Sequence, residues 1–177
     1  NREVAELFAV EDAIAREIAE KLKVPLTGKQ KMQLAKKQTK NAEAYQHYLK
    51  GRFHWNKRVE SELKKAIKHF EQAIELDPAF ALAYAGLADS YGVLCAWSEC
   101  LPAEAFPTAK QMAMKALELD DSLAEAHTSL GYINVVYEWN WPEAEREYRR
   151  AIELNPSYAN AHHWYAYMLM VQARFDE

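Results

Sequence analysis

Histidines are the side chains in this sequence with the clearest capacity for chemistry. His127 and His162 occupy equivalent places in two similar segments, and His163 directly follows the second. Imidazole nitrogens bind metal ions, but a metal site needs three or four converging ligands, which usually include a carboxylate or a thiolate. No such set accompanies these histidines. We therefore interpret them as polar aromatic residues at the edge of a helical core and expect no metal.

The other reactive groups form no catalytic motif. Cys95 and Cys100 have no neighbouring histidine or basic residue that would activate a thiol. Their spacing fits neither a zinc knuckle nor a thioredoxin motif, so we expect reduced thiols in a cytoplasmic protein. The sequence also lacks glycine-rich phosphate-binding loops and the nucleophile elbow of hydrolases. We expect no enzyme and no cofactor in these residues.

The elements that carry these residues repeat along the chain. Half of the 177 residues are hydrophobic and only 5 are Gly and 6 are Pro, which is typical of a helical protein. Three segments place apolar residues at i, i+4 and i+7, on one face of a helix. These residues are Ala66, Phe70 and Ala73, then Ala109, Ala113 and Ala116, then Ala144, Tyr148 and Ala151. The segments end at Asp77-Pro78, Asp120-Asp121 and Asn155-Pro156; proline cannot continue a helix, so the chain turns there.

A second helical pattern follows each of these stops. It contains a pair of one bulky and one small residue: Leu87-Ala88, Leu130-Gly131 and Tyr165-Ala166, with Gly51 in the same place before the first stop. We interpret the small residue as the point where two helix backbones cross closely.

Leu130-Gly131 followed by Ala144, Tyr148, Ala151 and Pro156 resembles the tetratricopeptide repeat (TPR), a helix–turn–helix unit of about 34 residues. The resemblance covers residues 42–177. It implies an all-α fold, a right-handed α-solenoid of TPR-like helix–turn–helix repeats. The repeats would span about 42–78, 79–121 and 122–156, with a truncated repeat at 157–177.

The first 41 residues differ from these repeats. Residues 1–24 form an amphipathic helical stripe that Pro25 closes, and residues 25–41 are a basic linker. Residues 7–19 resemble the last helix of the TolB-like domain that precedes such repeats in bacterial signalling proteins. This resemblance implies a module of a larger bacterial signalling or regulatory protein. A kinase, cyclase or DNA-binding output domain would then lie outside these residues.

The resemblance also implies a binding surface, because the first helix of each TPR pair lines the concave face of the array. We expect a protein or peptide ligand in this groove, with Trp55, Tyr132 and Tyr167 as anchors. Outer-face residues such as Lys115 and Glu147 should contribute little. The candidate groove residues are Tyr48, Arg52, Trp55, Asp89, Glu125, Thr128, Tyr132, Asn160, His163 and Tyr167. The basic clamp of the subfamily that binds chaperone tails is absent from the matching positions.

Two alternative functions remain open. The last repeat would expose Trp164, Tyr165, Met168 and Leu169 and so allow self-association into a homo-oligomer. Residues 21–59 carry eleven basic residues and one acidic residue, Glu43, so anion or nucleic-acid binding is a weaker alternative. Most of these bases are lysines, which read phosphate less specifically than arginine does, and nucleic acid is not favoured.

One segment is long enough to be tested as a membrane span. Residues 79–98 contain a single charged side chain, Asp89, near the centre. An aspartate at that depth costs about 2.5–3.5 kcal/mol on insertion scales, so we expect no membrane span.

Overall fold

The computed structural model describes residues 39–97 and 100–176, and within these ranges the chain forms only helices and short connections. The predicted helix 1–24 and residues 25–38 of the predicted linker 25–41 lie outside the described residues, and so do residues 7–19 with their resemblance. The helices are α3 (Ala42–Trp55), α4 (Glu60–Leu76), α5 (Ala81–Trp97), α6 (Pro102–Leu119), α7 (Ala124–Val136), α8 (Trp141–Leu154) and α9 (Ala159–Val171). The predicted all-α fold class is therefore confirmed.

The stops predicted from sequence end three helices in the same way. Asp77, Asp120 and Asn155 follow the last residues of α4, α6 and α8, and their backbone leaves the helical region. A side-chain oxygen of each accepts a hydrogen bond from the backbone N–H two residues later, at 3.0, 3.1 and 3.2 Å respectively. Such Asx turns replace the helical hydrogen bonds that the chain gives up at each stop.

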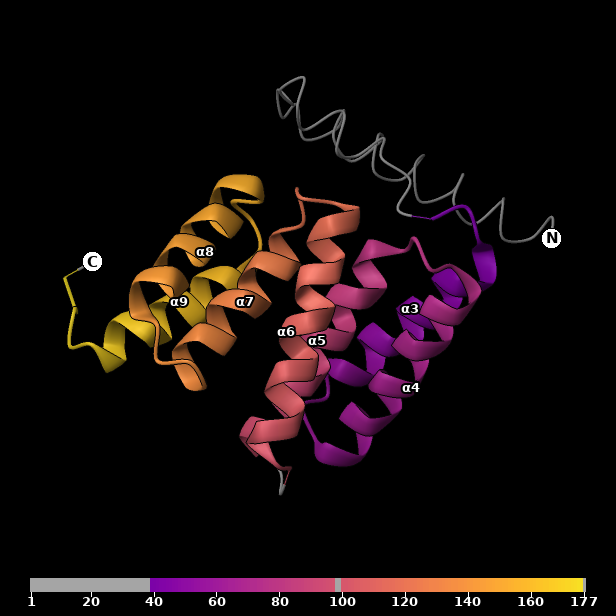
Figure 1. Ribbon diagram of the computed structural model, residues 1–177, viewed down its shortest axis with the longest axis horizontal. Helices are drawn as coiled ribbons and strands as arrows, with labels where there is room; N and C mark the ends of the chain where they lie inside the picture. The colour runs from indigo at the N-terminus through magenta and orange to yellow at the C-terminus, as the bar shows by residue number, and fades with distance from the viewer. Residues whose placement is uncertain (1–38, 98–99, 177) are drawn as a thin grey trace, which may run out of the picture.

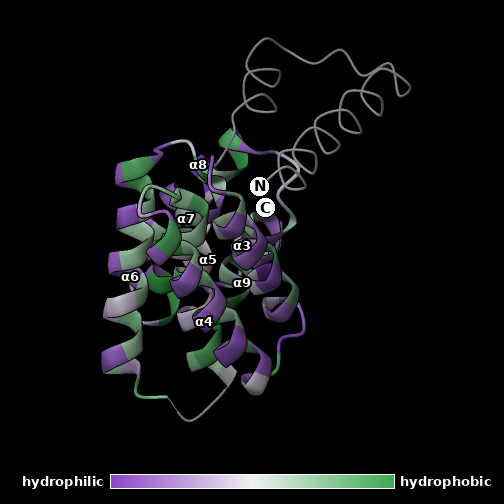
Figure 2. Ribbon diagram, turned by 90° about the vertical axis from the view of Figure 1, so that its right-hand side faces the viewer, coloured by the Kyte–Doolittle hydropathy of each residue, from purple (hydrophilic) through white to green (hydrophobic). Residues whose placement is uncertain are grey.

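The helices pack as antiparallel pairs, α3 with α4, α5 with α6 and α7 with α8 (Figure 1). The first helices also contact one another in the order α3, α5, α7 and α9, whereas α4, α6 and α8 make no comparable contacts among themselves. The first helices therefore form a continuous inner layer, and the second helices lie outside it. In Figure 2, α6 carries hydrophilic residues along its outer side.

Glycine makes room for aromatic rings between these layers. A Cβ atom on Gly51 or Gly86 would lie 2.7 or 2.5 Å from the Phe70 ring, and one on Gly131 would lie 2.7 Å from the Tyr148 ring. At Gly51 and Gly131 the atoms nearest to this position belong to an aromatic ring of the partner helix. The space that their missing side chains leave is filled by a ring from the partner helix of the pair.

The prediction of two reduced thiols is also wrong. Cys95, in the last turn of α5, and Cys100, just before α6, form a disulfide with their Cα atoms 5.2 Å apart. The antiparallel pairing of α5 and α6 brings the two residues within the range that a disulfide requires. Because the two cysteines are bridged, they do not support the expected cytoplasmic location.

The last helix buries residues that were expected to be exposed. Met168 and Leu169 on α9 pack against Val135, Ala144 and Tyr148 and are buried. The exposed apolar side chains of α9 are instead Tyr167, Met170 and Val171. The expected exposure is therefore wrong for Met168 and Leu169, whereas Trp164 and Tyr165, the other two residues of the self-association alternative, are partly buried.

No described helix is both long and apolar enough to cross a lipid bilayer.

Candidate functional site

A cluster of charged and aromatic side chains lies on the inner layer, centred on Asp89 of α5. Arg52 of α3 places Nη1 3.8 Å from Asp89 Oδ2, and Ser129 of α7 donates a hydrogen bond from Oγ to Asp89 Oδ1 at 3.3 Å. Glu125 of α7 and Tyr158, which precedes α9, interact electrostatically with Arg52. Three helices, and the residue that precedes a fourth, thus contribute to one polar centre within the inner layer.

The carboxyl group of Asp89 is buried, and the nearby positive charges offset only part of the cost of burying it. Only 8% of the residue is exposed. Burial raises the pKa of Asp89 to about 6, against the opposing attraction of Arg52 and of Arg58. Burial also raises the pKa of Glu125. Perturbed carboxyl groups of this kind are found preferentially at functional sites.

Two arginines contact one tryptophan at the edge of this centre. The guanidinium carbon of Arg52 lies 4.5 Å from the centroid of the Trp55 ring, and that of Arg58 lies 3.7 Å from it. Both positions are within the range of cation–π attraction. The indole N–H of Trp55 is buried and has no hydrogen-bond partner among the described residues.

Arg58 reaches the Trp55 ring from the turn between α3 and α4. Its backbone has φ 54°, in the left-handed region that non-glycine residues seldom adopt. The turn closes with a hydrogen bond from the Arg58 N–H to the Trp55 carbonyl oxygen at 3.2 Å. A non-glycine residue keeps this backbone conformation where the surrounding structure holds it in place. Here the Arg58 side chain stacks on the ring of Trp55, three residues earlier in the chain.

Aromatic residues extend the inner layer toward α9. Tyr132 of α7 lies 4.6 Å from Trp164, and Trp164 makes edge contacts with His163 at 4.7 Å and with Tyr167 at 6.0 Å, all between ring centroids. Tyr167 is 38% exposed, and His163 is exposed as well. Asn160 donates a hydrogen bond to the Tyr158 hydroxyl at 3.3 Å.

The structure thus brings most of the predicted groove residues onto one layer, but it buries several of them. Trp55 is 1% exposed, and Tyr132 is buried against Trp164. Thr128 is buried and bonds its hydroxyl to the Ala124 carbonyl within its own helix. Tyr48 packs between the Phe70 and Phe80 rings. Trp55, Tyr132 and Thr128 therefore support the surface rather than form its exposed part, and Tyr48 is half-buried.

Sequence reasoning missed Arg58, Tyr158 and Trp164 as members of this layer, and it placed Ser129 there only through the positions that match the basic clamp. Tyr158 and Arg58 lie in connections, where helical periodicity assigns no face. Arg58 had been counted only as one of the bases of residues 21–59. Ser129 follows the candidate residue Thr128 on α7, whose helix was predicted from the sequence.

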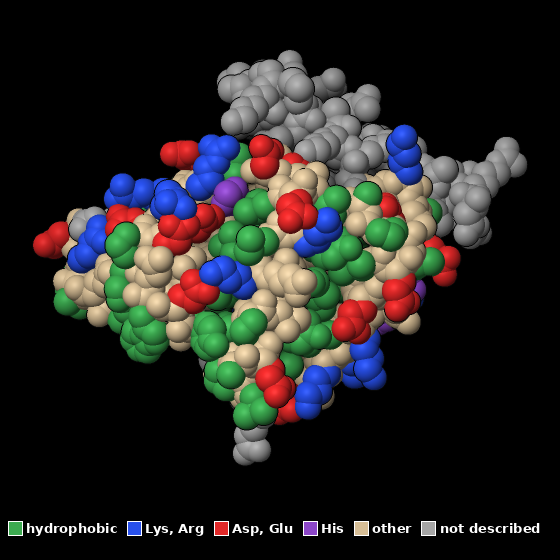
Figure 3. All heavy atoms as spheres, in the orientation of Figure 1, with side chains coloured by type: hydrophobic (Ala, Val, Ile, Leu, Met, Phe, Trp, Pro, Cys, Tyr) green, Lys and Arg blue, Asp and Glu red, His purple; other side chains and the backbone are tan. Residues whose placement is uncertain are grey.

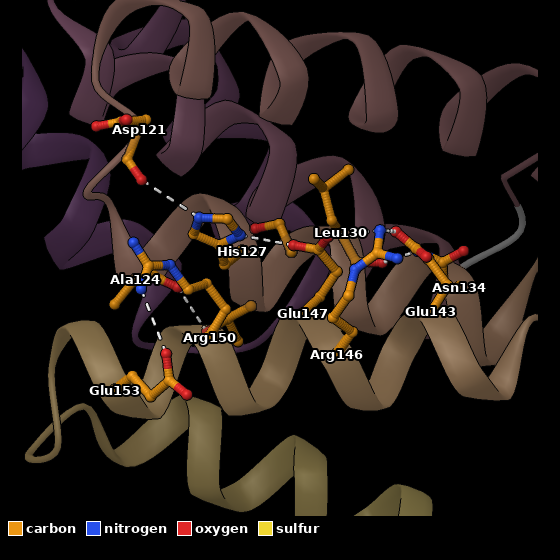
Figure 4. A network of polar contacts seen from close by, with 12 residues as sticks. Asp121, Ala124, His127, Leu130, Asn134, Glu143, Arg146, Glu147, Arg150 and Glu153 are labelled. Carbon is orange, nitrogen blue, oxygen red and sulfur yellow. Dashed lines mark hydrogen bonds and ion pairs between the residues drawn. The ribbon is translucent and has the colours of Figure 1, made fainter.

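Glu147 does not behave as the exposed outer-face residue that the sequence suggested. Its Oε2 lies 2.6 Å from Nδ1 of His127, and the two side chains are 12% and 14% exposed. Figure 4 shows this contact bridging α7 and α8 beside Arg146 and Arg150. His127 therefore joins two helices, in keeping with its interpretation as a residue at the core edge.

Side chains of both charges lie on the outer helices of the described residues. On the side where α6 lies foremost, Figure 3 shows Lys and Arg interspersed with Asp and Glu. Several of these groups form short-range pairs along one helix, such as Arg150 with Glu153 at 3.3 Å. Within the described ranges, no group of three His, Cys, Asp or Glu side chains is placed to hold a metal ion.

The comparisons with known proteins agree with this architecture. Residues 60–92 match the family model of the TPR repeat. The Arabidopsis OM64 TPR domain has a TM-score of 0.56 and 22% identity, covering 71% of this chain and 93% of that domain. The first TPR domain of human RPAP3, determined by NMR, has a TM-score of 0.57 and 19% identity, covering 76% and 95%.

A third similar structure is the first TPR of Spaghetti (RPAP3) bound to the HSP90 peptide SRMEEVD. It has a TM-score of 0.56 and 19% identity, and the match covers 77% of this chain and 98% of that chain. No curated protein sequence matches this chain. The chain therefore contains a TPR repeat, and its described helices have the fold of TPR domains.

Proposed function

We propose that this chain is a peptide-binding scaffold whose ligand lies along the inner layer formed by α3, α5, α7 and α9. The observation that carries the proposal is the polar centre around Asp89, where the buried carboxyl group of Asp89 and the half-buried one of Glu125, both with raised pKa values, lie near Arg52. Buried charges that are only partly compensated destabilise a fold, so their presence on one layer favours a role in binding.

The neighbouring structure of Spaghetti (RPAP3) holds an HSP90 peptide. At 19% identity it supports a common fold, and we do not carry its ligand over to this chain. Ala85, Asp89, Glu125, Thr128 and Ser129 stand at positions where the chaperone-tail subfamily has its basic clamp. We propose a different peptide as the ligand. The placement of this scaffold in a larger bacterial signalling protein is part of the same proposal and rests on residues 7–19.

Selection of peptides from a random display library tests the proposal. Selected peptides should lose about thirtyfold in affinity with Tyr167→Ala, the typical effect of truncating an aromatic anchor. Met114→Ala is the matched control, because Met114 is an exposed apolar residue on the outer helix α6. Equal losses in both variants, or loss only in the control, would place the binding site elsewhere. Circular dichroism verifies that each variant is folded.

A further inference from the structure

Histidines and lysines gather where α3 and α4 meet, at the end of the row of helices away from α9 (Figure 1). Nδ1 of His47 on α3 lies 3.2 Å from Nδ1 of His69 on α4, and the His54 ring stacks on the His69 ring with 5.4 Å between the centroids. Lys50 lies close enough to act electrostatically on His69. These residues all belong to the first helix pair, and other residues of that pair, such as Leu63, form the core that it shares with α5.

Positive charge is in excess at this junction. Glu62 of α4 is shared by several bases: its Oε2 lies 2.6 Å from Nζ of Lys57 and 2.8 Å from Nδ1 of His54. Its Oε1 lies 2.5 Å from Nζ of Lys65. One carboxylate thus serves two lysines, and Lys50 adds a third positive charge beside them. The junction therefore favours contact with an acidic partner.

Exposed apolar side chains border these charges. Phe53 of α3 is 61% exposed, and Nζ of Lys57 lies 4.6 Å from the centroid of its ring. Leu49, one helical turn earlier on the same side of α3, is exposed too, as is Val59 before α4. Apolar patches with a polar rim are frequent at protein–protein contacts. The seam face is the name used below for the surface formed by Leu49, Lys50, Phe53, Lys57, Val59 and Lys65.

The sequence of residues 1–24 complements the seam face in both respects. Residues 1–20 carry six acidic and two basic side chains. Opposite charges across a contact favour association and select the partner. The segment also has an amphipathic stripe, of the kind by which a helix packs against an apolar surface. This stripe consists of Val4, Leu7, Phe8, Ile14, Ile18 and Leu22.

The chain can bring this segment to the seam face. Asn41 caps the start of α3, and its side chain accepts hydrogen bonds from the backbone N–H groups of Glu43 and Ala44. Phe53 lies about 17 Å along α3 from the first residue of that helix, at 1.5 Å per residue. Residues 25–38 span up to about 45 Å when extended. The connection is therefore long enough, and a tethered segment meets its site at an effective concentration on the order of millimolar.

We propose that residues 1–24 dock on the seam face of the same chain. Their apolar stripe lies on Leu49, Phe53 and Val59, and their acidic side chains lie towards Lys50, Lys57 and Lys65. The docked segment covers one end of the array. This inference concerns a surface of the first helix pair outside the polar centre around Asp89, so it does not depend on the proposed peptide ligand.

Carbodiimide cross-linking of the full chain, followed by mass spectrometry, maps the contact, because the reagent joins an amine to a neighbouring carboxylate. Links from the acidic residues of 1–20 to the lysines of the seam face should exceed links to Lys115 of α6 by roughly tenfold or more, since docking holds these groups together. Lys115 is the matched control: its side chain is 44% exposed and pairs with Glu118, as that of Lys57 is 44% exposed and pairs with Glu62. Mixing isotope-labelled with unlabelled chains separates links within one chain from links between copies.

Substitutions in the full chain test the two parts of the contact. Phe53→Ser should speed amide hydrogen exchange in residues 1–24 roughly tenfold, as expected when a phenylalanine side chain loses a buried contact. Lys50→Glu should also speed it, because the acidic segment then faces a like charge. Met114→Ser and Lys115→Glu are the matched controls, since both residues lie on the outer helix α6. Circular dichroism verifies that each variant is folded, and the cross-linking map needs no substitution.

Four results would overturn the docking. Links to Lys115 as frequent as links to the seam face would show unspecific contact, and an absence of links to the seam face would refute it directly. Links found only between differently labelled chains would assign the seam face to a second copy. Equal exchange in the Phe53→Ser and Met114→Ser variants would exclude the apolar contact. The proposed function is tested separately, because none of these measurements involves a peptide ligand.

Discussion

Replacement of Asp89 by asparagine should make the protein more stable at neutral pH. Asparagine has nearly the shape of aspartate and can still accept the hydrogen bond that Ser129 donates at 3.3 Å. It carries no charge, so the cost of burying an ionised group disappears. The attraction of Arg52 lowers that cost for aspartate, but burial outweighs it, since the pKa of Asp89 lies above its ordinary value.

The size of the effect follows from the two pKa values. The carboxyl group has a pKa of 3.8 when unperturbed and about 6 in the fold. Between these values the folded state binds more protons than the unfolded chain, so stability is greatest below the lower value and is lost as pH rises through the higher one. A tenfold difference in proton affinity corresponds to about 1.4 kcal/mol. At pH 7.5 the ionised Asp89 therefore costs about 3 kcal/mol.

Urea unfolding followed by circular dichroism, at a series of pH values from 4 to 7.5, measures this cost. The stability difference between Asp89→Asn and the unaltered chain should grow by about 2–3 kcal/mol across this range in favour of asparagine. Glu153→Gln is the control, because Glu153 is exposed and should show almost no pH-dependent difference. A difference for Asp89→Asn that stays constant with pH would refute the reasoning.

Three further predictions concern packing, the disulfide and a histidine. Gly131→Ala should destabilise the fold by about 1–3 kcal/mol in the same assay, because the added Cβ would lie 2.7 Å from the Tyr148 ring; an unchanged midpoint would contradict this packing. The Cys95–Cys100 disulfide closes a short loop, and its reduction should lower the free energy of unfolding by about 2 kcal/mol. The measurement compares urea unfolding with and without dithiothreitol. Equal stability in both would show that the disulfide does not stabilise the fold. Burial and neighbouring histidines lower the pKa of His69 below 6.5, so its neutral ring stabilises the fold above that pH, and this stabilisation is lost as the pH falls. His69→Gln should therefore weaken the fall in melting temperature at acidic pH. An identical fall in both proteins would exclude His69 as its source.

Much of the fold could be predicted because its signals are local. The apolar spacing around Ala66, Phe70 and Ala73 and the stops at Asp77 and Asn155 act within single segments, and the structure shows helices that end at these stops. The candidate site could be predicted only in part. The inner layer follows from the order of helix pairs, whereas the exposure of each side chain depends on packing against other helices, as Tyr132 against Trp164 shows.

The sequence by itself determined the helices and their stops, because periodicity and turn chemistry depend on neighbours along the chain. The layer that faces inward was predicted from the resemblance to the TPR family. Tertiary structure alone decided which residues meet across segments. Phe70 fits between Gly51 and Gly86, which belong to different helix pairs. Arg58 reaches the layer from a turn that has no periodicity to reveal its direction. The charge of Asp89 was visible in the sequence, but the burial that raises its pKa comes from the packing of α5 within the inner layer.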